Sequence, residues 1–180
     1  AAVRHLIEVF TDDLKEVTAK ATNPLTGLKV APHYGCQMLR PRKYPHENVE
    51  EPTFFENLLS AIGAEPVDFL LRLRCCGAAL IITNREAALS MVRNLLQNAV
   101  DSKADVIATA CPLCQVNLEC YQDQVNAEFG TKFNMPIFYF SQLMGLAFGI
   151  PAKRLGVGME FVAPPPAMLA ACGKARAAAV

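Results

Sequence analysis

The chain has 180 residues, enough for one domain with a single hydrophobic core. Its 17 lysine and arginine residues balance 17 aspartate and glutamate residues, and this neutrality gives no reason to expect nucleic acid as a partner. Hydrophobic residues make up 52%, yet the most apolar stretch, residues 137–150, is shorter than the roughly 20 residues that a membrane-spanning helix needs. We therefore expect no membrane span.

Residues 1–20 place apolar side chains at helical spacing and predict an amphipathic helix, followed by a turn-rich break over residues 22–27. We treat residues 1–27 as a leading helix and linker. The sequence shows no basic segment leading into an apolar one, so we expect no signal peptide and a cytoplasmic protein. Because it begins with Ala1 inside a helix, we expect a processed or incomplete polypeptide.

Strands alternate with helices along the rest of the chain. The sequence predicts strands over residues 28–36, 67–76, 104–111 and 135–140, and helices over residues 53–63, about 80–99, 112–130 and 142–148. This alternation is typical of an α/β fold with a mainly parallel sheet flanked by helices. We expect one domain over residues 28–162 and an irregular Ala/Pro-rich tail over residues 163–180.

Five of the seven cysteines lie at or just beyond three predicted strand ends, in the pattern C-x38-C-C-G-x33-C-x2-C. Without a secretory signal, so many cysteines favour metal binding or redox chemistry over a disulfide scaffold. The carboxyl ends of parallel strands meet at one edge of a sheet, where ligands bind in open α/β folds. We therefore expect one site that contains Cys36, Cys75, Cys76, Cys111 and Cys114.

Three kinds of site fit this pattern to different degrees. A structural zinc ion needs four ligands, usually from two short Cys/His pairs, whereas five cysteines are present. Cys75 and Cys76 are adjacent, and adjacent side chains on an extended backbone point in opposite directions, which suits a multi-atom cluster better than one ion.

A dithiol redox motif is the second kind of site. It would use only the C-P-L-C segment at a predicted helix N-terminus, where a thiolate pKa falls, and would leave the other three cysteines without a role. An iron–sulfur cluster is the third kind of site, with thiolate ligands and C-x2-C spacing, and a helix N-terminus would offset part of its negative charge.

The segments HYGCQMLRP, RCCGAAL and ACPLCQVNL, in this order and spacing, resemble the cysteine-rich CCG domain in the B-type subunit of heterodisulfide reductase. The resemblance covers about residues 28–148 and extends to the leading helix. The B-type subunit carries two such repeats, and this chain, with one C-C-G, resembles the C-terminal repeat. The resemblance implies a non-cubane 4Fe–4S cluster ligated by all five cysteines.

The resemblance also implies a function. Such a subunit is an oxidoreductase that reduces, or forms, a thiol disulfide at its cluster, with electrons from a ferredoxin-like iron–sulfur subunit and with a flavin-containing subunit in the same complex. Catalysis by one CCG repeat alone stays open, because the family has two. The alternative is an electron-transfer or interaction module without its own substrate site.

Residues beside the cysteines have two interpretations each. His33 is a candidate general acid for a leaving thiolate, or a strand-end histidine bonded to nearby backbone. Gly35 and Gly77 flank cysteines and are expected to allow close backbone approach to the cluster, or to serve simple turns. Cys120, six residues after Cys114, is expected to point away from the site as a buried thiol, and Cys172 lies in the tail without a partner motif.

Five basic residues lie near the cysteines in sequence. Arg40, Arg42 and Lys43 could bind an anionic thiol substrate, or belong to a solvated loop or a partner contact. Arg72 and Arg74 alternate with leucines, so a strand would put both on one face. They would then compensate cluster charge, or lie on an exposed edge strand.

Overall fold

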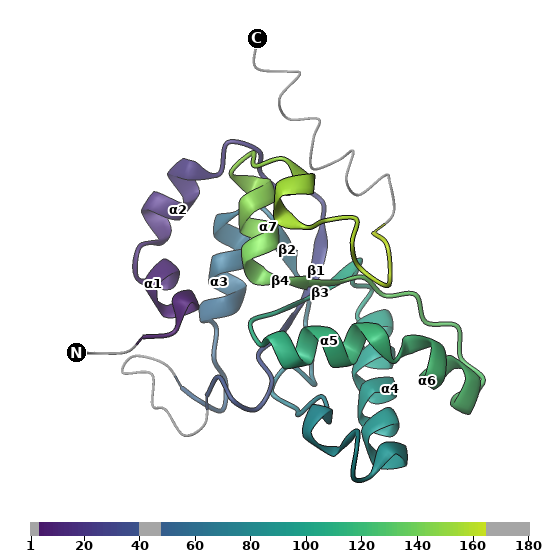
Figure 1. Cartoon of the computed structure of the whole chain (residues 1–180). Coiled ribbons are helices and arrows are strands. Elements are labelled where there is room, and N and C mark those ends of the chain that lie inside the picture. Colours follow the sequence, from purple (N-terminus) through teal and green to yellow (C-terminus); the bar gives the residue numbers. More distant parts are fainter. Residues whose placement is uncertain (1–3, 40–47, 165–180) are drawn as a thin grey trace.

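Four short parallel strands form the middle of the fold (Figure 1). The computed structural model describes residues 4–39 and 48–164. The elements in chain order are α1 (Leu6–Asp12), α2 (Leu14–Lys20), β1 (Lys29–His33), α3 (Phe54–Ala61), β2 (Glu65–Pro66), the 3-10 helix η1 (Ala78–Leu80), α4 (Arg85–Asp101), β3 (Val106–Thr109), α5 (Pro112–Cys120), α6 (Gln122–Phe129), β4 (Ile137–Tyr139), α7 (Phe140–Ala147) and η2 (Ala152–Leu155).

The sheet has the order β2-β1-β3-β4, and every pairing is parallel. His33 pairs with Thr109, and Thr109 pairs with Tyr139, so three strands end in register at one edge. The chain leaves β1 for β2 on one side and later returns to β3 on the other. The crevice beyond the ends of β1 and β3 is therefore a topological switch point, the usual ligand position in open α/β sheets.

Helices cover both faces of the sheet, and successive strand residues pack into different layers. Val106 and Ala108 face the core formed with α1, α2, α3 and α7, whereas Ile107 faces the core formed with α4, α5 and α6. Figure 1 shows α1, α2 and α3 on one side and α4, α5 and α6 on the other. The strands are buried on both faces, which explains their continuous apolar sequence. The predicted α/β fold with a parallel sheet is confirmed.

The leading segment packs on the same core as the sheet. Ile7 and Val17 are buried in the core that includes Leu58 of α3. The single predicted helix is two helices, because the Asp13 side chain accepts a hydrogen bond from the Glu16 backbone N–H (3.3 Å) and begins α2 anew. No helix within the described ranges is both long and apolar enough to cross a membrane.

The helix predicted over residues 112–130 is also divided, between α5 and α6 at Tyr121. Gln122 is buried, and its side chain bonds the backbone of Met135 in both directions, accepting from N–H at 2.8 Å and donating to C=O at 2.7 Å. These two hydrogen bonds join α6 to the segment that leads into β4.

The strand predicted over residues 67–76 is wrong. Strand β2 contains only Glu65 and Pro66, and residues 70–73 form turns, with Arg72 N–H bonded to Phe69 C=O (3.0 Å) and Arg74 N–H to Leu71 C=O (2.9 Å). The alternation of leucine and arginine therefore reflects consecutive turns, not the two faces of a strand. This segment folds across the end of β1.

Gly63 lies in a loop where the backbone packs closely against Pro24. At φ +81°, a Cβ there would lie 2.6 Å from Pro24 Cβ, whereas Gly130, at φ +65°, has open space. We expect Gly63→Ala to lose about 1–3 kcal/mol more unfolding free energy than Gly130→Ala, because both share the left-handed backbone cost and only Gly63 adds overlap. Urea unfolding measures both, and equal losses would contradict this packing.

Candidate metal centre

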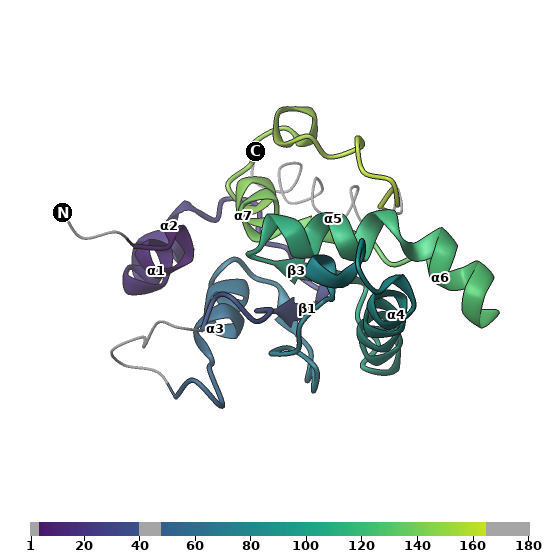
Figure 2. The ribbon, with the colours of Figure 1, turned by 60° about the horizontal axis from the view of Figure 1, so that its bottom comes forward.

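Three segments meet beyond the ends of β1 and β3 and carry the five cysteines. The backbone C=O of Arg72 accepts hydrogen bonds from the N–H groups of Tyr34 (2.9 Å) and Gly35 (3.2 Å), which join the β1 end to the turn before Cys75. The side chain of Asn117 on α5 donates to the C=O of Cys76 at 2.7 Å. Figure 2 shows η1, which follows the adjacent cysteines, beside α5.

The five thiols lie close enough together to interact with one another. Cys114 is hydrogen-bonded to both Cys76 and Cys111, Cys36 is hydrogen-bonded to Cys75, and Cys36 also lies within the electrostatic influence of Cys76. All five are free thiols. Cys76 and Cys114 are buried, whereas the other three are half-buried.

The environment favours thiolates at two positions. The hydrogen bond from Cys114 lowers the pKa of Cys76 to about 5, against the opposing effect of burial, and nearby His33 lowers it further. The same partner lowers the pKa of Cys111 to about 6, helped by backbone N–H groups at the start of α5. The pKa of Cys114 is raised, because both partners favour its protonated form. Burial raises the pKa of Cys36. Thiolates are the form in which cysteines bind metals.

Two glycines allow the segments to approach this closely. Gly35 has φ +68°, and a Cβ there would lie 3.1 Å from Cys114 Sγ. Gly77 has φ +85°, and a Cβ would lie 3.1 Å from Ala88 Cα of α4. Gly35 thus lets the backbone approach a thiol, whereas Gly77 lets it approach the backbone of α4.

His33 ends β1 and is fully buried. Neither ring nitrogen makes a hydrogen bond of normal geometry, so the expected backbone-bonded histidine is absent. The ring meets Phe69 edge-on at 6.3 Å and lies close enough to Cys76 to lower its pKa. Tyr34, its neighbour, bonds Glu56 and the Phe55 backbone N–H instead.

The other residues noted in the sequence lie in different surroundings. Arg72 forms an ion pair with Glu56 (3.6 Å), and Arg74 is exposed. Cys120 is half-buried rather than buried, and burial raises the pKa of its thiol. The remaining predictions concern residues outside the described ranges, namely Arg40, Arg42, Lys43 and Cys172.

The donor set fits a thiolate-ligated cluster better than one ion. Within residues 4–39 and 48–164, no three Cys, His, Asp or Glu side chains are already arranged around a single metal position. Five connected thiols exceed the four ligands of structural zinc, and thiolates are the standard ligands of iron–sulfur clusters.

Sequence reasoning missed the polar side chains that hold the cysteine loops. Besides Asn117, the Tyr139 hydroxyl donates to the C=O of Ala110 (2.9 Å), and Thr109 Oγ1 accepts from the N–H of Cys111 (3.2 Å). Asn117 follows Cys114 by three residues and so shares its helix face, which the sequence could have indicated. The contact of Tyr139 depends on the register of β4, which the sequence does not indicate.

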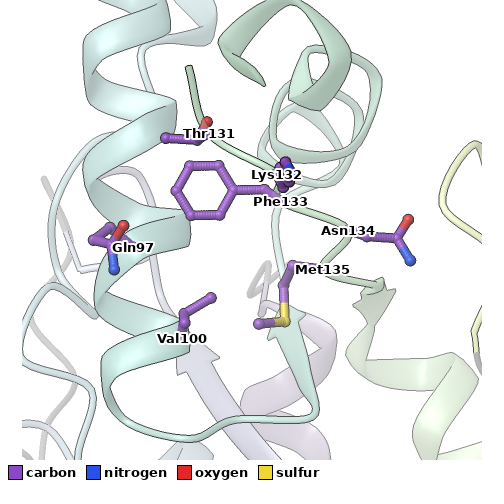
Figure 3. A pocket seen from close by; sticks show the side chains of 7 residues that line it. All are labelled: Gln97, Val100, Thr131, Lys132, Phe133, Asn134 and Met135. Atoms are coloured by element: carbon purple, nitrogen blue, oxygen red, sulfur yellow. The ribbon is translucent and has the colours of Figure 1, made fainter. Parts of the chain in front are cut away.

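A pocket lies at the edge of the sheet opposite to the cysteines. It has a volume of about 340 Å³ between α4 and the segment before β4, and Figure 3 shows Val100, Phe133 and Met135 around it. Its described lining holds no cysteine, histidine or carboxylate. The thiol group and this pocket are therefore separate.

Residues 30–119, which include all five cysteines, match the family described as "CCG: Cysteine-rich domain". The chain belongs to this CCG family. Over 161 residues it is 40% identical to the 8-methylmenaquinol:fumarate reductase membrane anchor subunit of Wolinella succinogenes, with 89% of this chain and 57% of that protein covered. The CCG resemblance drawn from the cysteine motifs is thus confirmed.

A second relative carries the name expected from the motifs. It is the B-type subunit of the Ferredoxin/F(420)H(2)-dependent CoB-CoM heterodisulfide reductase of Methanosarcina acetivorans, 38% identical over 162 residues, with 87% of this chain and 54% of that protein covered. The chain spans about half the length of these curated relatives. A crystal structure of a hypothetical protein from Helicobacter pylori shares the fold, with TM-score 0.63, 15% identity, and coverage of 83% of this chain and 28% of that one.

The Asn117 contact gives a testable expectation for the CCG loop. We expect Asn117→Leu to lose about 1–3 kcal/mol of unfolding free energy, because the C=O of Cys76 loses its buried side-chain donor. Exposed Asn134→Leu is the control and should change stability by less than about 0.5 kcal/mol. Urea unfolding compares the two, and equal effects would show that the Asn117 contact adds no stability.

Proposed function

We propose that this chain is an iron–sulfur subunit of a heterodisulfide-reductase-like complex, which reduces or forms a thiol disulfide at a non-cubane 4Fe–4S cluster. The observation that carries the proposal is the convergence of five thiols from three segments within the CCG match. In the reducing direction the reaction is RSSR′ + 2e⁻ + 2H⁺ → RSH + R′SH. When bound, the cluster supplies single-electron chemistry and an iron that can meet a substrate sulfur.

In this proposal the chain's own residues hold the cluster and shape its surroundings. Cys36, Cys75, Cys76, Cys111 and Cys114 are the ligands. The start of α5 directs backbone N–H groups toward Cys111, which favours negative charge there.

His33 is the proposed proton donor, because its ring is fully buried and lies close enough to Cys76 to lower the pKa of that thiol. The support for this role is the position of the ring. The alternative role of His33 is to donate a hydrogen bond to the bound cluster.

The proposed partners are a ferredoxin-like iron–sulfur subunit and a flavin-containing subunit, with a thiol or disulfide as substrate. The support is the name of the Methanosarcina relative, a subunit of a ferredoxin- or F(420)H(2)-dependent reductase. The Wolinella relative is instead named as a fumarate reductase subunit, so members of the family serve more than one complex. A cytoplasmic location stays a prediction.

An electron-transfer module without a substrate site is the second candidate. Burial of Cys76 and Cys114 favours it, since a covered cluster suits relay. The half-buried Cys36 and Cys75, which line a pocket, favour contact with a substrate. The two candidates therefore differ in whether a small thiol reaches the site.

Replacement of one ligand tests the site. We expect anaerobically reconstituted wild-type protein to contain iron and sulfide matching one 4Fe–4S cluster, and Cys76→Ser to lose most of both, because a buried ligand is removed. Cys120→Ser, which changes a thiol outside the group, is the matched control and should keep them. Metal analysis and the visible spectrum measure this outcome. A colourless wild-type protein with one zinc ion would exclude the cluster, and unchanged iron in Cys76→Ser would exclude that ligand.

Electron paramagnetic resonance separates catalysis from relay. We expect the signal of the oxidised, iron-containing protein to change when a small thiol is added, because Cys36 and Cys75 leave one side of the site accessible. A non-thiol alcohol of the same size is the control. A signal indifferent to every thiol would support the relay module.

A further inference from the structure

A pocket of about 540 Å³ adjoins the thiol group on the side of Cys36 and Cys75. Its size lies within the usual range of about 300–1,000 Å³ for small-molecule sites. The other three cysteines do not line it. The pocket therefore gives a small molecule from solution access to Cys36 and Cys75.

The pocket wall carries the half-buried guanidinium of Arg72. Arg72 lies 3.6 Å from Glu56 through Nε, which is beyond hydrogen-bond distance, and this buried Nε makes no hydrogen bond. Glu56 is itself hydrogen-bonded to the buried Tyr34, so Arg72 is held in place. Within the described residues Arg72 Nε has no hydrogen-bond acceptor, and a carboxylate is the small group that fits the fork of donors of a guanidinium.

Two carboxylates line the same pocket. Glu50 and Glu51 are exposed, and neither forms an ion pair with another residue in the described ranges. They would attract an ammonium group. Arg74, Gly35, and leucine and valine side chains complete the wall, so the lining provides two charges of each sign, apolar surface and two thiols.

We propose that this pocket binds a zwitterionic thiol or disulfide of the amino-acid type, with its carboxylate on Arg72, its ammonium group toward Glu50 and Glu51, and its sulfur toward Cys36 and Cys75. The proposal rests on the proposed function and deepens it by naming the substrate class. It differs from selection for a simple anion, because the lining carries two glutamates as well as two arginines.

Four small thiols test the proposal on the iron-containing protein by anaerobic titration calorimetry. L-cysteine carries both charges, N-acetylcysteine lacks the ammonium, cysteamine lacks the carboxylate, and 2-mercaptoethanol lacks both. We expect L-cysteine to bind about tenfold or more tightly than each of the others, because each removes at least one charge-assisted contact.

Variants assign the contacts. Arg72→Gln should weaken L-cysteine and N-acetylcysteine about tenfold and leave cysteamine unchanged, and Arg72→Lys should restore part of the loss. Glu50→Gln combined with Glu51→Gln should weaken L-cysteine and cysteamine only. Arg93→Gln is the matched control, since Arg93 is also half-buried with an unbonded Nε but stacks on Phe129 away from the pocket.

The outcomes separate this inference from the proposed function. Equal affinity for all four thiols, or equal effects of Arg72→Gln and Arg93→Gln, would overturn the inference even where thiols change the paramagnetic signal. Discriminating binding without any change in that signal would keep the pocket and overturn catalysis at the cluster.

Discussion

The arrangement of the cysteines depends on the hydrogen bonds that the backbone carbonyl of Arg72 accepts. It accepts the N–H groups of Tyr34 and Gly35 and so fixes the turn before Cys75 to the end of β1. Buried backbone groups must be paired, so this contact also satisfies donors that the strand leaves open. Asn117 then joins the next residue, Cys76, to α5. Two local contacts thus bring three distant segments together.

The parallel sheet makes this convergence possible. β1, β3 and β4 end in register, and the switch between β1 and β3 opens a crevice at their carboxyl ends. Cys36 follows β1 and Cys111 follows β3, so the topology supplies two of the three segments directly. The third comes from the turns after β2, which cross the edge instead of continuing the sheet. Two of the three cysteine segments are therefore positioned by strand ends, and the third is positioned by a loop.

The sequence predicts the features that depend on the spacing of apolar residues and on the order of the strands. It does not predict the features that depend on single tertiary contacts. The strands near residues 30, 107 and 138 were predictable from continuous apolar runs, and the cysteine edge followed from their parallel order. The strand predicted over residues 67–76 does not form, because the chain turns at residues 70–73, where Leu71, Arg72 and Leu73 are all half-buried and no two faces alternate. The helix division at Gln122 depends on Met135, thirteen residues later, and the role of Tyr139 depends on strand register. Neither contact leaves a local pattern.

The unequal burial of the five thiols has a consequence for their reactivity. Cys76 and Cys114 lie beneath the surface, whereas Cys36 and Cys75 face a pocket and Cys111 is half-buried. A water-borne oxidant therefore meets Cys36, Cys75 and Cys111 before it meets the two buried thiols, because access to a thiol falls with its burial. Chemical damage to the site thus starts at its rim and reaches the buried thiols last.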